Sequence, residues 1–485
     1  MGVLRFRVNE SHRVPSFVTE VAHVCGMDRI PWRGTTEWDG SLLIHRRPID
    51  ESGVFFGPWI LNTGRWTTLV TSSLREQAAE YQLEREFARG TISRLRELHA
   101  QMVSAGCPIS ETAEGYCRQS QDTFLSHVGV DTEASCQAID QGVLAIEALM
   151  KDLLSFRKQK LSDSTQLSQS LRLGTVGTPF PSIESEEAFV DLFDTVSIPV
   201  RWREIETENG KYDWQSLDRW VTWAAENGRR ISMGPLLRLD AYYLPEWIYL
   251  LQNRTEVLRK SVFEFIQEIV KRYRDHVDLW QCTSGLNLPG ESGLDSDERV
   301  QLAVIAVKAV SEISSNKPIV MRFDQPWGEH LIANELEFSA FQFADSLIGA
   351  KIGLSGLGID FHFGYWPGGS LNRDSLQFHL MLQRWSMFEL PLLIGFAVPH
   401  SSLDSNDNYS DSLLRTDQYL PTPLTQAAEL ERLLSVAVTA PYVHGIAYSA
   451  FFDHDSLATP LAGLIDDSGF PRPACQKWYQ VMSDR

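Results

Sequence analysis

"HVDLWQCTSGLNLPG", residues 276–290, is an apolar run that passes into a loop containing glycine, proline and polar residues. A short run of this kind, bounded by turn residues, is typical of a strand that is buried on both faces. Seven further segments of the chain have the same form. The predicted strands lie within residues 172–179, 197–205, 230–239, 277–285, 318–325, 356–364, 390–398 and 444–452.

Amphipathic helices are predicted between most of these strands, for example in WQSLDRWVTWAAENG (214–228) and SVFEFIQEIVKRYRD (261–275). Strands that alternate with helices indicate the α/β class and a parallel sheet. Eight such units predict a (β/α)8 TIM barrel, which we assign to residues 171–485. A doubly wound open sheet is the alternative, but no G-x-G-x-x-G motif follows the first strand to favour it.

The first 170 residues have a different pattern. Residues 1–73 contain short runs such as VLRFRV and GVFFGPWIL, which predict a small β-rich region. Apolar positions recur at helical spacing in residues 74–158, which predicts a helical segment. The polar stretch 159–170 lacks this spacing and is predicted to be a linker.

The composition limits the classes of partner. Hydrophobic residues make up 43% of the chain and charged residues 22%, as in ordinary globular proteins. The formal net charge of −19 argues against nucleic acid and against an anionic membrane surface, because both require a basic face. Six cysteines without a C-x-x-C pair favour reduced thiols over disulfides. No signal-peptide-like or membrane-spanning segment is seen, so we expect a cytoplasmic protein of unknown oligomeric state.

Polar and aromatic side chains gather at the carboxyl ends of the predicted barrel strands, where the active sites of such barrels lie. Aromatic faces stack on sugar rings and polar groups bind the hydroxyls, so this set predicts a site for a carbohydrate ligand. The candidate binding residues are Arg201, Trp202, Arg238, Asp240, Asn287, Arg322, Asp324, Gln325, Trp327, His362, Trp366 and Asp453.

Other chemistries have weaker support. The chain has no G-x-S-x-G, H-E-x-x-H or P-loop motif, and no cofactor is expected. A metal bound by His362, Asp453, His454 and Asp455 is a minor alternative, because oxygen and imidazole ligands hold zinc or manganese. We expect no metal site.

The order of several motifs resembles glycoside hydrolase family 10, the xylanase family. The segment VRWREIETENGKYDWQSLDRWVTWAAENGRRISMGPLLR (200–238) is similar to the second and third strands of that family. YLPEW (243–247), LSGLGIDFHFG (354–364) and PLAGLIDDSGFPRPA (460–474) resemble later motifs in the same order. The resemblance covers about residues 171–485 and places His362 on the family's histidine near the nucleophile. It implies a barrel that acts on or binds a polysaccharide or oligosaccharide.

The positions of the family's two catalytic glutamates carry no carboxyl group. Retaining glycosidases use one carboxyl group as acid and base and another as nucleophile, about 5–5.5 Å apart. The acid position falls on Ser284-Gly285, or on Asn287-Leu288 if the loop is longer. The nucleophile position falls on Gly395-Phe396. We therefore do not expect the usual retaining mechanism.

Three interpretations remain. In the first, hydrolysis is retained with relocated groups, Glu291 as acid and Asp360 or Asp324 as base or nucleophile. In the second, the barrel is non-catalytic and its arginines and aromatic residues bind a glycan. In the third, the barrel is a structural or interaction module, in which Asp360 is a buried partner of Arg322 or Arg201. The first requires two carboxyl groups within about 10 Å across an open cleft, the second a cleft without such a pair, and the third a filled cleft.

Overall fold

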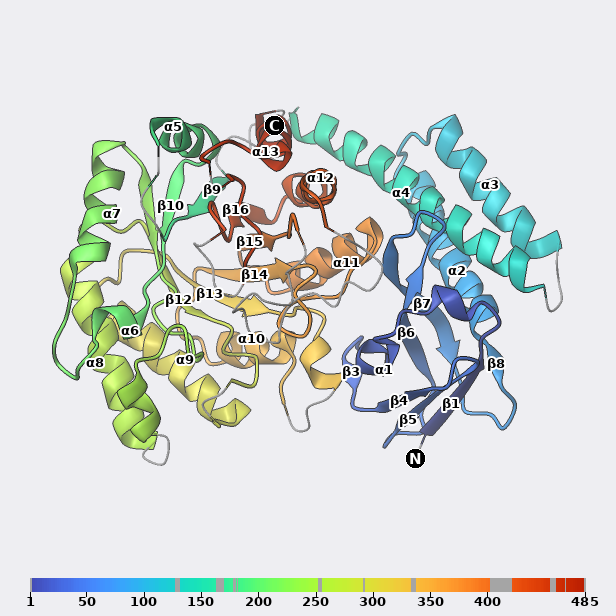
Figure 1. The fold of residues 1–485 in the computed structure, drawn as a ribbon, viewed down its shortest axis with the longest axis horizontal. Coiled ribbons are helices and arrows are strands. Elements are labelled where there is room, and N and C mark those ends of the chain that lie inside the picture. Colours follow the sequence, from blue (N-terminus) through green and yellow to red (C-terminus); the bar gives the residue numbers. More distant parts are fainter. Residues whose placement is uncertain are drawn as a thin grey trace.

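Eight parallel strands close into a barrel in the second part of the chain (Figure 1). The computed structural model describes residues 2–126, 131–162, 170–177, 180, 182–251, 255–290, 293–332, 337–401, 421–453, 459–466 and 468–483. Each of the predicted strand segments overlaps one barrel strand, and the predicted (β/α)8 barrel is confirmed. The strands are β9 (Leu171–Thr175), β10 (Thr195–Ile198), β11 (Arg230–Met233), β12 (Leu279–Ser284), β13 (Ile319–Asp324), β14 (Gly356–His362), β15 (Leu392–Ala397) and β16 (Val443–Tyr448).

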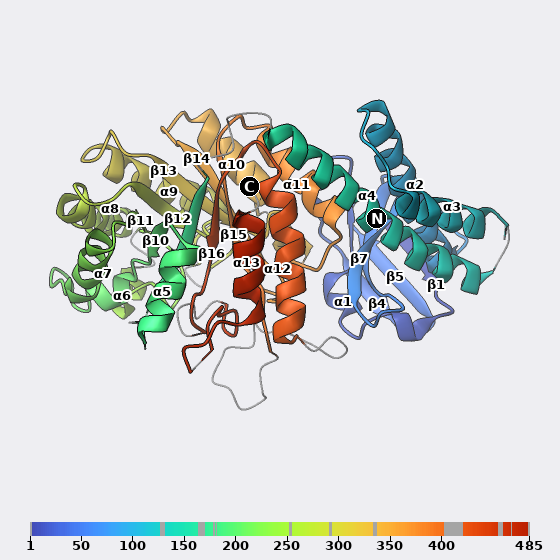
Figure 2. The ribbon, with the colours of Figure 1, turned by 90° about the horizontal axis from the view of Figure 1, so that it is seen from above.

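Helices cover the outside of the barrel (Figure 2). Several begin at a side-chain cap, where a Ser, Asp or Thr oxygen accepts a hydrogen bond from a backbone N–H of the first turn. The capped helices are α5 (Ile183–Leu192), α9 (Ser296–Ser311), α10 (Ala340–Gly349), α11 (Ser375–Ser386) and α12 (Pro423–Val438). The others are α6 (Trp202–Ile205), α7 (Gln215–Glu226), α8 (Thr255–Tyr273) and α13 (Pro473–Ser483).

The inner face of the barrel changes from apolar to polar along the strands. Every second residue of a strand faces the same side, so residues two apart form successive layers. The first layer is an apolar cluster of Leu173, Leu279, Val320, Leu393 and Ala447. Two residues further along the same strands stand Thr175, Gln281, Arg322, Gly395 and Ser449. The polar groups are therefore brought to the carboxyl ends of the strands, as in other barrels of this kind.

The amino-terminal region forms a separate β-rich core. One four-stranded sheet has the order β4-β5-β1-β8 and the other the order β3-β2-β6-β7. Of their inward residues, Phe55 and Trp59 pack on Phe87 of the following helix, and Phe6 packs on Phe55. The strands are β1 (Gly2–Arg7), β2 (His23–Cys25), β3 (Pro31–Trp32), β4 (Thr35–Trp38), β5 (Leu42–Arg47), β6 (Gly53–Ile60), β7 (Trp66–Leu74) and β8 (Tyr81–Gln82), with the short helix α1 (Val18–Val21) between β1 and β2.

Three helices connect this region to the barrel: α2 (Leu83–Ser104), α3 (Glu111–Ser126) and α4 (Thr132–Ser162). The helical segment thus begins later than residue 74, because β8 still pairs with β1. It also extends into the predicted linker, since α4 continues to Ser162. Gln159 and Lys160 are exposed at this end of α4.

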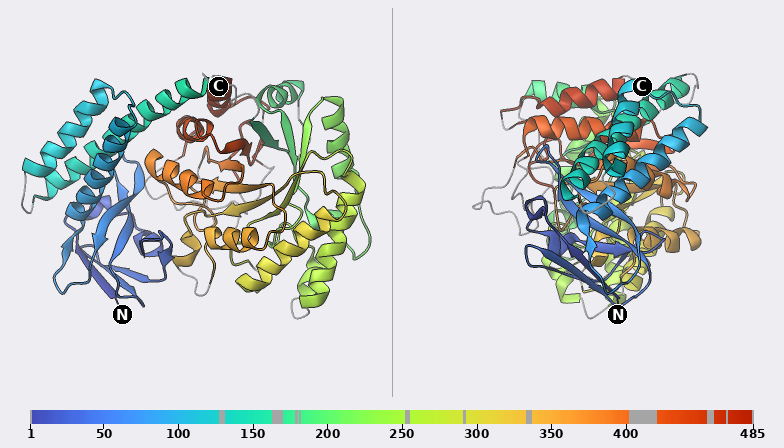
Figure 3. Two further views of the ribbon diagram at one scale, coloured as in Figure 1. Left: turned by 180° about the vertical axis from the view of Figure 1, so that it is seen from behind. Right: turned by 90° about the vertical axis from the view of Figure 1, so that its right-hand side faces the viewer.

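The amino-terminal region packs against one flank of the barrel, beside α11 and α12 (Figure 3). Arg65 Nη2 lies 2.6 Å from Glu429 Oε2 of α12. Arg94 Nη1 of α2 lies 2.7 Å from Asp374 Oδ2, at the start of α11. Backbone groups also join the two parts, since Thr68 N donates to Asn372 O at 2.9 Å. The extension is therefore held on the barrel by buried polar contacts.

All six cysteines are buried free thiols. Among the described residues, none of the helices combines the length and the apolar character that a membrane span requires.

Candidate functional site

A pocket opens at the carboxyl ends of the barrel strands, and we call it the mouth pocket. It includes five of the residues that the sequence predicted: Arg201, Arg238, Arg322, Asp360 and His362. The remaining lining residues are Thr175, Ser197, Pro199, Gly234, Pro235, Tyr242, Tyr243, Ser284 and Ser449. The predicted cluster of polar groups thus comes together in space from different strands and the loops that follow them.

Gln281 anchors the floor of this pocket. Its Nε2 donates to Ser197 Oγ at 2.9 Å and to Ser232 Oγ at 2.8 Å. Its Oε1 accepts a hydrogen bond from Arg322 Nη1 at 2.8 Å. All of these side chains are buried, so the network holds β10, β11, β12 and β13 in one arrangement. The chain positions Arg322 through this amide.

Arg322 is paired with Asp360 on the neighbouring strand. Its Nε lies 3.2 Å and 3.0 Å from the two carboxylate oxygens, and its Nη2 also contacts Oδ1. Asp360 is 2% exposed and Arg322 is 8% exposed. This is the buried ion pair that the sequence left open as the alternative to a catalytic Asp360. Forked pairing of this kind engages both oxygens of the carboxylate.

The Arg322–Asp360 pair occupies the space beside Gly395. In the strand register, Gly395 of β15 lies next to Asp360 of β14. A Cβ at position 395 would overlap Asp360 Oδ1 and lie 2.5 Å from Arg322 Nη2. Phe396, the next residue, packs its ring near Phe361 and Phe378 instead. A side chain pointing inward from position 395 therefore has no room while the pair is formed.

Position 285, on the other side of the mouth pocket, is also restricted. Gly285 follows β12 with a φ of +68°, a conformation that favours glycine. A Cβ there would lie 2.9 Å from Asp324 Oδ2. Asn287 is fully buried, where it exchanges hydrogen bonds with the backbone of Asp324 at 2.8 and 3.1 Å. Asn287 thus holds the strand end and does not point at a ligand.

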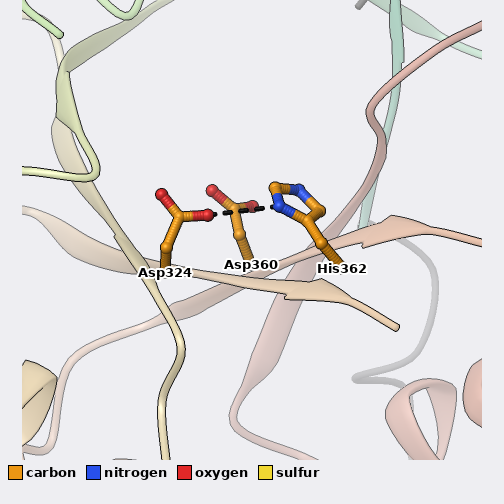
Figure 4. A group of neighbouring side chains, drawn as sticks. All are labelled: Asp324, Asp360 and His362. Carbon is orange, nitrogen blue, oxygen red and sulfur yellow. Dashed lines mark ion pairs between the residues drawn. The ribbon is translucent and has the colours of Figure 1, made fainter. Parts of the chain in front are cut away.

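Asp324 is surrounded by positive and polar groups. His362 Nδ1 lies 3.2 Å from Asp324 Oδ1 (Figure 4). Arg238 Nη1 lies 3.9 Å from Oδ2 of the same carboxylate. Burial alone would raise the pKa of the Asp324 carboxyl, but the His362 ring and the Arg238 and Arg322 charges hold that pKa below its usual range. Asp324 therefore carries a negative charge at neutral pH.

Arg238 is shared between two acids. Its Nε contacts Asp240, and its Nη1 lies 3.4 Å from Ser284 Oγ. Burial lowers the pKa of Arg238, but Asp240 and Asp324 outweigh this and raise the pKa above its ordinary value. Asp240 also accepts hydrogen bonds from the backbone N–H groups of Tyr242 and Tyr243 at 3.0 and 3.2 Å. The Arg238–Asp240 contact thus fixes the loop that brings the two tyrosines to the pocket.

Asp324, Asp360 and His362 could be considered as metal ligands, because one ligand atom of each lies within 4.8 Å of the others. Two features disfavour a cation. Arg322 engages both oxygens of Asp360, and Arg238 places a second guanidinium near Asp324. A metal would have to displace one arginine and would meet the charge of the other.

The remaining predicted residues lie outside the mouth pocket. Trp202 is 2% exposed and stacks on Phe265. Arg373 Cζ lies over the ring of Trp327, 4.6 Å from the ring centroid. The side chain of Gln325 donates to Pro367 O, and Trp366 lines a groove with Phe17 and Trp66. Asp453 lies 3.0 Å from His400 and 2.9 Å from Arg472. Glu291, His454 and Asp455 lie outside the described residues.

Sequence reasoning missed Gln281, Ser449 and the two tyrosines. Ser449 follows β16, and its Oγ lies 3.4 Å from His362 Nε2. Its place directly after a strand that ends at Tyr448 is the signal that could have included it. Tyr242 stands directly before the YLPEW motif and Tyr243 is its first residue, where aromatic residues alone do not distinguish a pocket wall from packing.

Comparisons with known proteins bear on the barrel. The sequence model described as Glycosyl hydrolase family 10 matches residues 191–283, from the end of α5 to β12. Among solved structures, xylanase 10B from Thermotoga maritima has a TM-score of 0.48 and 17% identity, over 65% of this chain and 95% of that chain. Xylanase 10B from Thermotoga petrophila RKU-1, in complex with xylobiose, has a TM-score of 0.49 and 16% identity, over 68% and 97%. Xylanase B from Clostridium stercorarium F9 has a TM-score of 0.48 and 14% identity, over 64% and 96%.

At these identities the likeness to solved structures concerns the fold alone. No curated protein matches the sequence. The family match lies within the segment whose motifs carry the resemblance, and the fold around it is the complete barrel. Residues 191–283 thus match the sequence model of Glycosyl hydrolase family 10, and they lie within a closed (β/α)8 barrel.

Proposed function

We propose that the mouth pocket binds a carbohydrate and that the barrel does not hydrolyse it by the retaining mechanism. The family match of residues 191–283 supports a glycoside-hydrolase-like role. The pocket wall supports a sugar ligand, because it combines the rings of Tyr242 and Tyr243 with serine hydroxyls and guanidinium groups. Aromatic faces and convergent hydrogen-bonding groups are what a sugar ring requires.

The observation that carries the loss of the usual mechanism is the Arg322–Asp360 pair beside Gly395. Neither position that should hold a catalytic glutamate has a carboxyl group, and the pair fills the inward space at one of them. Asp360 does not replace the missing nucleophile as a free carboxylate, because Arg322 engages both of its oxygens.

Relocated hydrolysis by Asp324 and Asp360 has weaker support. Their ligand atoms lie within 4.8 Å of each other, close to the separation of about 5–5.5 Å in retaining enzymes. However, the two residues stand side by side on β13 and β14, not across the pocket. Although burial favours protonation, His362 and Arg238 keep the pKa of Asp324 low, whereas a glycosidase acid needs a raised pKa.

The test is to measure binding and hydrolysis with one set of xylo-oligosaccharides, neutral and glucuronic-acid-substituted. We expect calorimetric binding without release of reducing ends. Tyr242→Ala, which removes a ring from the pocket wall, should weaken the binding free energy by about 1 kcal/mol. Arg274→Ala is the control, because Arg274 follows α8 at the opposite end of the barrel.

Hydrolysis with retained anomeric configuration would overturn the proposal. So would the absence of binding across a wider array of plant and bacterial oligosaccharides, which would favour a structural or interaction barrel.

A further inference from the structure

One serine of the mouth pocket, Ser449, lies next to the ring of His362. Ser449 Oγ lies 3.4 Å from His362 Nε2, and on the other side of the ring His362 Nδ1 lies 3.2 Å from Asp324 Oδ1. We infer that Ser449, His362 and Asp324 form a nucleophile, a general base and an orienting acid that transfer an acyl group. The choice of a sugar ester as substrate rests on the proposed function; the nucleophile itself does not.

The fold places each member of this group for its role. Asp324 ends β13, His362 ends β14 and Ser449 follows β16, so all three stand at the same end of the barrel. Ser449 and His362 line the mouth pocket, where a substrate can reach them, while Asp324 is 2% exposed. The backbone N–H of Ser449 donates to Phe396 O at 2.9 Å, which fixes the position of the serine.

The charges favour the required tautomer of His362. Asp324 carries a negative charge, and its oxygen faces Nδ1, so the ring proton belongs on Nδ1. The Nε2 atom is then free to accept a proton from the serine hydroxyl. This is the division of roles in serine hydrolases, which recurs on unrelated folds and is recognised by geometry and not by sequence order.

The inferred reaction is the hydrolysis of an ester through an acyl-serine intermediate. Ser449 Oγ attacks the carbonyl carbon of an ester while His362 Nε2 takes the Oγ proton, which gives a tetrahedral oxyanion. The bond from this carbon to the alcohol oxygen then breaks, and His362 gives its proton to that oxygen. Water then attacks the carbonyl carbon of the acyl-serine while His362 Nε2 takes a proton from it. The bond from this carbon to Ser449 Oγ breaks, and His362 returns the proton to Oγ. The products are a carboxylic acid, the alcohol and the free serine.

The pocket indicates the class of substrate. Its volume of about 60 Å³ has room for a short acyl group next to Ser449. The guanidinium groups of Arg201, Arg238 and Arg322 line the same pocket, and their positive charges favour a developing oxyanion there. A short-chain ester of a sugar hydroxyl, such as an acetyl ester, therefore fits the site.

The first experiment uses a fluorophosphonate probe, which forms a covalent bond with activated serines, on the full chain. We expect one labelled site, identified as Ser449 by peptide mass spectrometry. Ser449→Ala should abolish the label, and Ser435→Ala, whose hydroxyl bonds to Glu431 O at 2.7 Å on α12, should retain it. An unlabelled wild-type protein, or a label that persists in Ser449→Ala, would overturn the inference.

The second experiment measures hydrolysis of 4-nitrophenyl acetate and of acetylated xylo-oligosaccharides. Ser449→Ala and His362→Gln should lower kcat by about a thousandfold. Asp324→Asn tests the positioning residue: kcat should fall while KM stays unchanged, and circular dichroism reports whether this variant folds. Rates in Ser449→Ala equal to those of the wild type would contradict the inference.

The two proposals fail in different ways. Calorimetric binding of the deacetylated oligosaccharide to Ser449→Ala tests the carbohydrate site without the nucleophile. Labelling without glycan binding would retain the acyl-transfer inference and remove the sugar as substrate. Glycan binding without labelling would retain the proposed function alone.

Discussion

Gly395 and Asp360 face each other across the pairing of β15 with β14. The glycine leaves a space, and the Arg322–Asp360 pair fills it. Buried ion pairs are costly to break from one side, since the remaining charge is left without a partner. The loss of an inward side chain at position 395 and the presence of the pair are therefore linked physically.

Gly395→Ala tests this link at the residue scale. We expect the free energy of unfolding to fall by about 1–3 kcal/mol, because the new methyl group overlaps the pair. Gly349→Ala is the matched control at the end of α10, where no described residue lies within 4 Å of the added Cβ. That change should be neutral or slightly stabilising. Equal losses for the two variants in urea denaturation would contradict the account.

At the scale of elements, one residue at the start of α11 both caps this helix and contacts α2. Asp374 is the N-cap, and its Oδ1 accepts a hydrogen bond from Gln377 N at 2.8 Å. Its Oδ2 lies 2.7 Å from Arg94 of α2. Burial would raise the pKa of Asp374, but Arg94 and the Gln377 N–H hold that pKa below its usual range. One carboxylate thus begins a barrel helix and binds the amino-terminal region to it.

Asp374→Ala should lower the free energy of unfolding by about 3 kcal/mol or more, because it removes the cap and leaves the partly buried Arg94 without its partner. Asp374→Asn should cost less, since the amide oxygen can still accept from Gln377 N. Asp295→Ala, at the exposed N-cap of α9, isolates a cap and should cost about 1 kcal/mol. Denaturant titrations compare the three. An Asp374→Ala loss no larger than that of Asp295→Ala would show that the contact with Arg94 adds nothing.

On the scale of the whole molecule, Glu429 of α12 connects the barrel to the β-rich region. It contacts Arg432 of its own helix and lies 2.6 Å from Arg65 of the amino-terminal region. Burial acts to raise the pKa of Glu429, but the two arginines lower it from 4.5 to about 2. The folded state therefore holds this carboxylate ionised over a wider pH range than the unfolded chain does.

The lowered pKa of Glu429 makes the free energy of unfolding depend on pH. Because the folded pKa lies below the unfolded value, the contribution is complete above about pH 4.5 and is lost as the pH falls towards 2. It is on the order of 3 kcal/mol at neutral pH. Glu429→Gln should therefore be less stable than the wild type at neutral pH, and the difference should shrink on acidification.

Urea denaturation of both proteins from about pH 7 to about pH 3 measures this difference. Glu431→Gln is the control on the same helix, because Glu431 forms a more exposed pair with Lys477 at 2.9 Å and should change stability by less than about 1 kcal/mol. A difference between wild type and Glu429→Gln that stays constant with pH would contradict the assignment.

Part of the site could be predicted from the sequence, because alternate residues of a strand point to the same face. Asp360 and His362 are two residues apart on β14, and Arg322 and Asp324 are two apart on β13, so each pair was expected at one strand end. The sequence did not decide whether Asp360 is catalytic or pairs with Arg322 or Arg201. Trp327 and Trp366 were predicted to bind sugar, yet they lie among other contacts, because an aromatic residue after a strand can pack on either side of the loop.

What the sequence by itself determined is the set of elements: the eight strand segments, the helices between them and the family to which residues 191–283 are similar. These follow from local apolar spacing, turn residues and motif order. Only the tertiary structure decided that Arg322 pairs with Asp360 beside Gly395, and that Ser449 meets His362. Such contacts depend on the register in which β9 to β16 close, and a shift of one residue would turn each of these side chains to the other face of its strand.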